Sequence, residues 1–341
     1  MSDRRANGRG GGRRWWVPAV AVGVAGAAAG ALAAQHRAVR RALAEAHAEA
    51  GAEQLELPAD VVRHEVVTGD GARICVVERG RGPALLLLHG MLLSSEIWVH
   101  QFTDLADRYR VVAVDLRGHG RSTAGERPLD IATMADDVHA VVEQLGLEGC
   151  LLVGHSMGGM VALQLAQQLD RNGRIPFGAM VVVSSASGPF VKVPGWRSVA
   201  RVGAPAWSRM TLLAERAGGT LAPAEDLRWW MVRLGFGPEP VPAQVRFVEQ
   251  IQAATATGTL ARLLPMLAGL DLSTGLFDVE LPVLVVVGTH DRLTPPRYAR
   301  RLAASLQHGQ LVELPRCGHM PMLERRREFS RLLDEFCAKV G

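Results

Sequence analysis

A serine between glycines, in the segment Gly154 to Gly159, constrains the fold of this 341-residue chain more than any other feature. The apolar run 150–153 before it is typical of a buried parallel strand, and the Ala-, Leu- and Gln-rich stretch after it is typical of a helix. A sharp strand-to-helix turn leaves no room for side chains two residues on either side of Ser156, and both positions are glycine. The sequence therefore predicts a strained turn that exposes the Ser156 hydroxyl. The alternative is a glycine-rich turn with an idle serine.

An acid and a base follow in chain order, each directly after a predicted strand. Asp291 follows the apolar run 281–288, and His319 follows the short strand 310–314. Loops at the carboxyl ends of parallel strands converge on one site. An imidazole can take the proton of a serine hydroxyl, and a carboxylate can hold that imidazole in the required tautomer. We expect Ser156, Asp291 and His319 to form a catalytic triad; the alternatives are a turn-forming aspartate and a surface-loop histidine.

Three further segments complete a pattern that resembles a known family. They are the strand and loop 85–91, which ends in His-Gly-Met, the segment 114–122, which reads V-D-L-R-G-H-G-R-S, and the Gly-His pair at 318–319. Together with the order serine, aspartate, histidine, they make the chain from about residue 61 onward similar to α/β-hydrolases of the esterase and lipase type. The resemblance implies that the backbone N–H groups of Met91 and Met157 form the oxyanion hole. For Met91 the alternative is ordinary loop packing.

The other histidines and glycines are given simpler interpretations. His89 and His119 lie beside glycines in turns that they are expected to brace, His155 occupies a variable position of the serine turn, and His290 neighbours the acid. No pair of cysteines or histidines has the spacing of a zinc site, and the glycines near the N-terminus follow no strand. We therefore expect no metal and no cofactor.

Predicted strands and helices alternate through the chain. An antiparallel pair is expected at about 61–67 and 73–78, and the pattern that follows predicts an α/β fold with a mostly parallel, doubly covered sheet. The further strands are predicted at 84–88, 111–115, 151–154, 180–184, 283–287 and 310–314, and the helices at 95–108, 131–145, 157–170, 296–306 and 322–339.

Roughly ninety residues separate two of these strands, which is too many for an ordinary connection. They are rich in Trp and Met, and spacings such as Leu227, Met231, Leu234 fit amphipathic helices. We therefore predict a helical cap at 188–278, inserted between core segments 55–187 and 279–341. Part of its apolar surface is expected to roof a pocket for an apolar substrate.

The N-terminal residues 1–54 form a separate unit in this interpretation. Five arginines precede an uncharged run at 15–34, which is long enough to cross a bilayer, and an Ala-, Glu- and Arg-rich stretch at 35–54 suits a helical stalk. Three interpretations stay open: a membrane anchor with a cytoplasmic N-terminus, a cleaved export signal, or a disordered cytosolic extension.

Charge and cysteine content exclude some partners. The net charge of +4 comes partly from the arginine-rich terminus, and no basic stripe interleaved with aromatics indicates nucleic-acid binding. Attraction to a membrane surface fits the charge better. The four cysteines form no disulfide framework, so we expect free thiols.

The sequence thus predicts a serine hydrolase that cleaves esters with an apolar acyl or alkyl group, including lipid-like substrates. A serine nucleophile argues against the epoxide hydrolases and haloalkane dehalogenases of the family, which use aspartate. Thioesterases, perhydrolases, acyltransferases and C–C bond hydrolases or lyases share the triad and stay open as alternatives. So does a binding module that has lost catalysis. The oligomeric state is left open.

Overall fold

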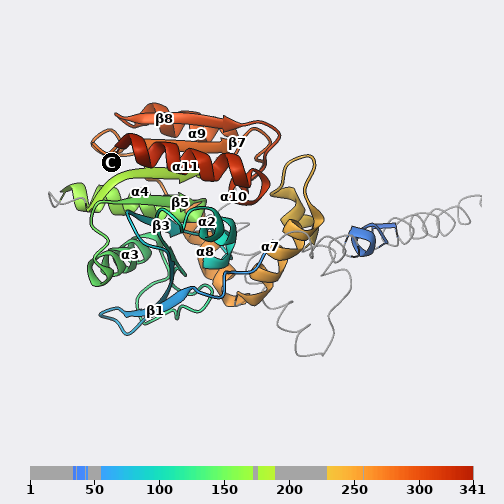
Figure 1. Ribbon diagram of the computed structural model, residues 1–341, viewed down its shortest axis with the longest axis horizontal. Helices are drawn as coiled ribbons and strands as arrows, with labels where there is room; N and C mark the ends of the chain where they lie inside the picture. Colours follow the sequence, from blue (N-terminus) through green and yellow to red (C-terminus); the bar gives the residue numbers. More distant parts are fainter. Residues whose placement is uncertain are drawn as a thin grey trace, which may run out of the picture.

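The computed structural model describes residues 34–35, 37–42, 44, 55–171, 176–188, 229–255 and 257–340. These residues build an eight-stranded sheet in the order β1-β2-β4-β3-β5-β6-β7-β8, which runs from the bottom to the top of Figure 1. β2 is antiparallel to both of its neighbours, and all other neighbouring strands are parallel. The strands are β1 (Val62–Val67), β2 (Arg73–Arg79), β3 (Ala84–Leu88), β4 (Arg110–Val114), β5 (Cys150–His155), β6 (Phe177–Val183), β7 (Val283–Gly288) and β8 (Gly309–Leu314).

Helices cover both faces of this sheet. Side chains alternate along β3, so that Leu86 and Leu88 pack into one core with α3, α4 and α9, whereas Leu85 and Leu87 pack into a second core with η1, α2 and α11. The predicted doubly covered α/β fold is therefore confirmed. The helices are η1 (Ser95–Trp98), α2 (Val99–Asp104), α3 (Ile131–Leu145), α4 (Met157–Arg171), α7 (Pro242–Ala254), α8 (Thr257–Gly269), α9 (Pro296–Ser305), α10 (Pro321–Glu324) and α11 (Arg326–Val340).

Two predicted helices are interrupted. The helix expected at 95–108 is a 3-10 turn, η1, followed by α2, which ends at Asp104. The chain then turns so that the backbone N–H groups of Arg108 and Tyr109 both bind the carbonyl of Leu105, and the Tyr109 hydroxyl reaches Asp334 on α11. A tertiary contact more than two hundred residues away thus ends this helix, which local sequence could not reveal.

The helix expected at 322–339 is broken at Arg325, whose backbone is not helical. The short α10 that precedes the break carries Glu324, and the carboxylate of Glu324 accepts backbone N–H bonds from Gly237, Gly318 and Met320. These bonds hold α10 against the loop that contains His319. The break therefore separates a short helix that supports the site from α11, which covers the sheet.

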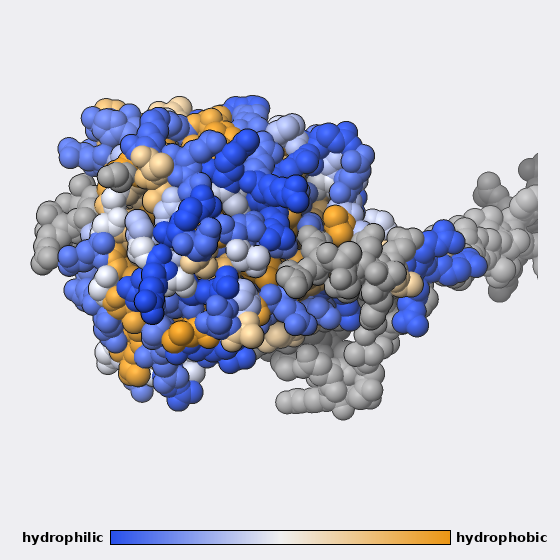
Figure 2. All heavy atoms as spheres, viewed as in Figure 1, coloured by the Kyte–Doolittle hydropathy of each residue, from blue (hydrophilic) through white to orange (hydrophobic). Residues whose placement is uncertain are grey.

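The described parts of the predicted cap are residues 229–255 and 257–278, which include α7 and α8; residues 189–228 lie outside the described residues. Residues 15–33 of the predicted membrane run lie outside them as well. Among the helices that the structure describes, none has both the length and the apolar character of a membrane span. Hydrophilic residues predominate on the face of the molecule seen in Figure 2, with apolar ones in small groups. All four cysteines are free thiols.

Candidate active site

Ser156 lies in the turn between β5 and α4, as the sequence predicts. Its φ angle is +52°, a left-handed conformation that is rare for a residue with a side chain. A Cβ atom at Gly154 would lie 2.4 Å from the carbonyl oxygen of Gly158, and one at Gly158 would lie 2.4 Å from that of Leu88. Both glycines are therefore required by space. The turn is strained and tightly enclosed, yet Ser156 itself is partly exposed between buried neighbours.

Asp291 follows β7 and is buried, although the residues on either side of it in the loop are exposed. Its Oδ1 accepts the backbone N–H bonds of Leu293 (2.9 Å) and Thr294 (2.8 Å), and its Oδ2 accepts the Thr294 hydroxyl at 2.7 Å. The fourth donor is the His319 ring, whose Nδ1 lies 2.8 Å from Oδ2. Burial acts to raise the pKa of Asp291, but the His319 ring and the hydrogen bonds outweigh it, so the pKa lies below its usual value. Asp291 is therefore an anion at neutral pH.

His319 lies in the loop after β8 and is held on several sides. Its backbone N–H binds the carbonyl of Gly235, and the Glu324 carboxylate accepts the N–H groups of the residues before and after it. Because ionised Asp291 can only accept a hydrogen bond, Nδ1 of His319 carries the proton and Nε2 is the basic nitrogen. Burial raises the pKa of the supporting Glu324 carboxyl, while its three backbone bonds act in the other direction.

His155 connects the serine turn to His319. Its Nε2–H donates to the carbonyl oxygen of His319 at 2.8 Å, and the two ring centroids are 4.8 Å apart. Burial lowers the pKa of His155 to about 3, and the His319 ring contributes in the same direction. His155 is thus a neutral hydrogen-bond donor that fixes the position of His319. Since Ser156 is the next residue in the chain, the structure brings Ser156, Asp291 and His319 to one edge of the sheet; no hydrogen bond joins the Ser156 hydroxyl to His319 among the described residues.

The loop after β3 lies directly beside the serine. A Cβ atom at Gly90 would lie 3.1 Å from Cβ of Ser156. The His89 ring braces this loop, as the sequence predicts: its Nδ1–H donates to the carbonyl oxygen of Gly90 at 2.7 Å, and its Nε2 accepts the N–H of Leu116 at 2.9 Å. In a trans peptide the C=O and N–H groups point in opposite directions, so the Met91 N–H points away from His89.

Met157, the other predicted donor, is the first residue of α4. The N–H groups of a helix's first turn have no partner within the helix, and the helix dipole favours negative charge there. Met91 and Met157 thus lie on the two chain segments that enclose Ser156, one following Gly90 and one following the serine itself.

The sequence prediction missed three residues of this site. Thr294 gives Asp291 two hydrogen bonds, and its only sequence signal is the D-x-x-T spacing. Glu324 follows His319 by five residues, and His155 was interpreted as occupying a variable position. Among the described residues no group of histidine, cysteine or carboxylate side chains could hold a metal ion.

Comparison with known proteins agrees with this geometry. The model of the alpha/beta hydrolase family matches residues 85–332, which is most of the chain. The chain belongs to the alpha/beta hydrolase family. Over 274 residues this hydrolase is 28% identical to the AB hydrolase superfamily protein YisY of Bacillus subtilis, which covers 80% of this chain and 98% of the relative.

Two other similar proteins are named as esterases. The hydrolase is 31% identical over 273 residues to the pimeloyl-[acyl-carrier protein] methyl ester esterase of Aeromonas hydrophila, with 76% of this chain and 98% of the relative covered. The crystal structure of the esterase RhEst1 from Rhodococcus sp. ECU1013 superposes with a TM-score of 0.67 at 26% identity, covering 82% of this chain and 99% of that one. The predicted family, fold and enzyme class are confirmed.

Proposed function

We propose that this hydrolase cleaves carboxylic esters with an apolar acyl or alkyl group, with Ser156 as nucleophile, His319 as base and Asp291 as the residue that orients the base. The observation that carries the proposal is the bond between Nδ1 of His319 and Asp291, at the edge of the sheet where Ser156 projects from a strained turn. This bond fixes the tautomer in which Nε2 can accept the proton of the serine hydroxyl.

The reaction then follows from the residue types. Ser156 Oγ attacks the ester carbonyl while its proton passes to Nε2 of His319, and the Met91 and Met157 N–H groups bind the developing oxyanion. His319 returns the proton to the leaving alcohol, and water activated by the same nitrogen hydrolyses the acyl-enzyme. A hydrogen bond between the Ser156 hydroxyl and Nε2 of His319 is expected to form with substrate in place.

The surroundings of His319 support an imidazolium in the transition state. Ionised Asp291 lies 2.8 Å from Nδ1, and the neighbouring ring of His155, with its centroid 4.8 Å away, is neutral at physiological pH because its pKa is about 3. A protonated His155 would repel the charge that forms on His319. The negative charge of Asp291 therefore stabilises the imidazolium, and the neighbouring His155 ring adds no positive charge that would oppose it.

An apolar substrate is supported by the chain segment beside His319. Residues 229–234 are helical, and the segment that follows hydrogen-bonds to the His319 backbone through Gly235. A Cβ atom at Gly235 would lie within 4 Å of both His319 and Leu293. Large apolar side chains are exposed here, namely Trp230, Met231, Leu234 and Leu293. Apolar groups left exposed beside reactive residues are typical of a binding surface for an apolar ligand.

An ester is favoured over the other substrates of this triad by the names of the relatives, two of which are esterases. The test is activity-based labelling with a fluorophosphonate, together with hydrolysis of p-nitrophenyl esters from acetyl to decanoyl and of matched thioesters. We expect labelling at Ser156 and a kcat/KM that rises with chain length, since each buried methylene contributes about 0.8 kcal/mol. Labelling at another serine contradicts the nucleophile; a preference for thioesters or for acetyl groups contradicts the substrate.

The N-terminal run 15–34 is proposed to anchor the enzyme at a bilayer, on the grounds of its length, its lack of charge and the arginines before it. Deleting residues 1–34 should move the protein to the soluble fraction without changing its rate on p-nitrophenyl acetate. An intact, uncleaved chain that fractionates as soluble without detergent rules the anchor out.

A further inference from the structure

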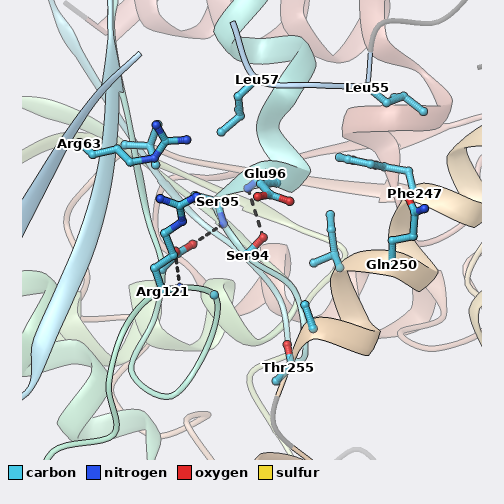
Figure 3. Close-up of a pocket in the computed structure, with 15 residues that line it drawn as sticks. Leu55, Leu57, Arg63, Ser94, Ser95, Glu96, Arg121, Phe247, Gln250 and Thr255 are labelled. Atoms are coloured by element: carbon cyan, nitrogen blue, oxygen red, sulfur yellow. Dashed lines mark hydrogen bonds between the residues drawn. The ribbon is translucent and has the colours of Figure 1, made fainter. Parts of the chain in front are cut away.

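A cavity of about 410 Å³ lies between segments before and after β3 and the helix α7 (Figure 3). It is lined from β1 by Arg63, from the start of η1 by residues 94–96, from the loop after β4 by Asp115 and Arg121, and from α7 by apolar side chains. Ser156, Asp291 and His319 are absent from its lining. Its size lies in the range of cavities that bind small organic molecules.

Part of the cavity wall lies far from Ser156 in the sheet and part of it lies nearer. Val77 belongs to β2, which is three strands from β5 in the order β2-β4-β3-β5, or about 14 Å at about 4.8 Å per strand. Residues 94–96 belong to the connection after β3, which pairs with β5. Because Ser156, Asp291 and His319 are not part of the wall, a small ligand can occupy the cavity without touching the serine.

Two of the residues that line the cavity, Arg63 and Arg121, are solvent-exposed arginines. Within the described residues, neither Arg63 nor Arg121 forms an ion pair or a side-chain hydrogen bond, whereas Arg110, for example, pairs with Glu78 through two bonds. Figure 3 shows both guanidinium groups extending to the same side of the cavity, from β1 and from the loop after β4. Unpaired guanidinium groups that converge on a cavity are suited to bind an anionic head group.

The two carboxylates of the cavity do not fill this role. Asp115 is buried, and its oxygens accept the backbone N–H groups of Ser95 (2.7 Å) and Arg121 (2.9 Å). Glu96 extends toward the α7 side in Figure 3. Burial and the Asp115 charge raise the pKa of Glu96, against the opposing influence of Arg121 and Arg63. The positive ends of the arginines therefore remain available to a ligand.

The opposite wall is mostly apolar, although Gln250 of α7 and Thr255 after it also line it. Leu55 and Leu57 come from the segment before β1, and Phe247 and Ile251 come from successive turns of α7. Leu55, Leu57 and Phe247 are only partly buried. A ligand that contacts both arginines and covers these side chains must combine an anionic head group with an apolar chain.

We propose that this cavity is a second binding site, for an amphipathic anion whose head group contacts Arg63 and Arg121 and whose alkyl chain lies along Leu57 and Phe247. A free medium-chain fatty acid is the source that fits a cavity of this volume, which is partly open to solvent. The phosphate of an anionic lipid shares the head-group chemistry and is distinguished by the test.

The test is calorimetric titration of the full chain with decanoate, below its micellar concentration. Arg63→Gln and Arg121→Gln should each weaken decanoate binding on the order of tenfold, because each removes a charge-assisted hydrogen bond. Arg301→Gln, an exposed arginine on α9 at the far end of the sheet, is the matched control and should leave the affinity unchanged. Decanol, which lacks the charge, should bind more weakly than decanoate.

The site itself is located by photo-crosslinking with a diazirine derivative of decanoic acid. Labelled peptides should contain Leu57 or Phe247. Labelling confined to the Met91 and Ser156 loops overturns the proposal, and so does equal decanoate affinity in the wild type and both variants. The fatty-acid proposal is also overturned if free decanoate does not bind while the protein binds phosphatidylglycerol vesicles and both substitutions weaken that binding. Because binding is measured directly, the outcome does not depend on whether Ser156 is the nucleophile.

Discussion

Two buried ionic clusters of this molecule differ in how completely their polar atoms are hydrogen-bonded. The difference bears on which of the two can take part in a reaction. Arg117 is fully buried, and its five N–H bonds all have acceptors: the carboxylates of Asp70 and Asp137, and the carbonyl of Ala124. In the second cluster Asp291 is as completely bonded, but its partner His319 is bonded through Nδ1 alone. Every N–H group of Arg117 is thus used within the first cluster. In the second, Nε2 of His319 has no hydrogen-bond partner among the described residues.

The saturated cluster fixes the loop after β4 by tying it to the β1–β2 turn and to α3. Hydrogen bonds from Arg117 and Thr68 hold the pKa of Asp70 well below its usual range. The next backbone N–H in the same loop, that of Leu116, binds His89, which braces the Gly90–Met91 peptide. The Arg117 cluster thus supports the candidate active site only indirectly, through the loop after β4.

The largest expected effect comes from removing the nucleophile. Ser156→Ala should lower kcat on p-nitrophenyl esters by a factor on the order of 10⁴ or more, because the lost hydroxyl takes part in bond formation. Urea unfolding should be little changed, since the Ser156 side chain is partly exposed. Retained hydrolysis would mean that another residue attacks the ester and that this second cluster is not reactive.

Breaking the saturated cluster should give the opposite result. Arg117→Met leaves Asp137 buried without a counter-ion, and loss of one partner of a buried ion pair costs about 3–5 kcal/mol of unfolding free energy. The kcat of the remaining folded enzyme should stay near that of the wild type. Arg127→Met is the matched control: its pair with Asp136 is exposed, so the expected cost is below about 1 kcal/mol. Equal losses for the two variants would contradict the distinction.

His155 tests how much the base depends on its support. His155→Phe removes the N–H bond to the His319 carbonyl and should lower kcat on the order of tenfold or more through misplacement of the base, with KM little changed. His155→Gln, which keeps an N–H donor of similar reach, should restore much of the rate. A purely structural role would instead lower the thermal stability of both variants and leave the kcat of the folded fraction unchanged.

The positions of Ser156, Asp291 and His319 after β5, β7 and β8 were predictable, because the local sequence indicates each of these strands; their catalytic roles stay predictions. His155 could not be assigned its role, since its partner lies 164 residues away along the chain. The same limit applies to the ends of α2 and α10: Asp104 bonds to Arg326 on α11, and Glu324 bonds to Gly237. Periodicity predicts a helix but not the distant contact that ends it. The cavity at Arg63 and Arg121 was missed because it joins segments far apart in sequence.

The smallest expected effect concerns the pH dependence of stability. The pKa of Asp291 lies below its ordinary value of 3.8 in the folded protein. As the pH falls through 3.8, the unfolded chain takes up a proton at this position before the folded one does, so the stabilising contribution of the Asp291 charge is complete above 3.8 and is lost as the pH falls toward the folded pKa.

Asp291→Asn cannot titrate, so the difference in unfolding free energy between the wild type and this variant should be constant from about pH 6 to 5 and should shrink below about pH 4. Urea unfolding at closely spaced pH values measures this difference. Asp107→Asn, at an exposed carboxylate, is the control for general acid effects on the chain. A difference in unfolding free energy that grows on acidification would mean that burial, rather than the His319 ring and the Thr294 bonds, determines the protonation of Asp291. The contrast between a fully hydrogen-bonded carboxylate and an available imidazole would then not hold for Asp291.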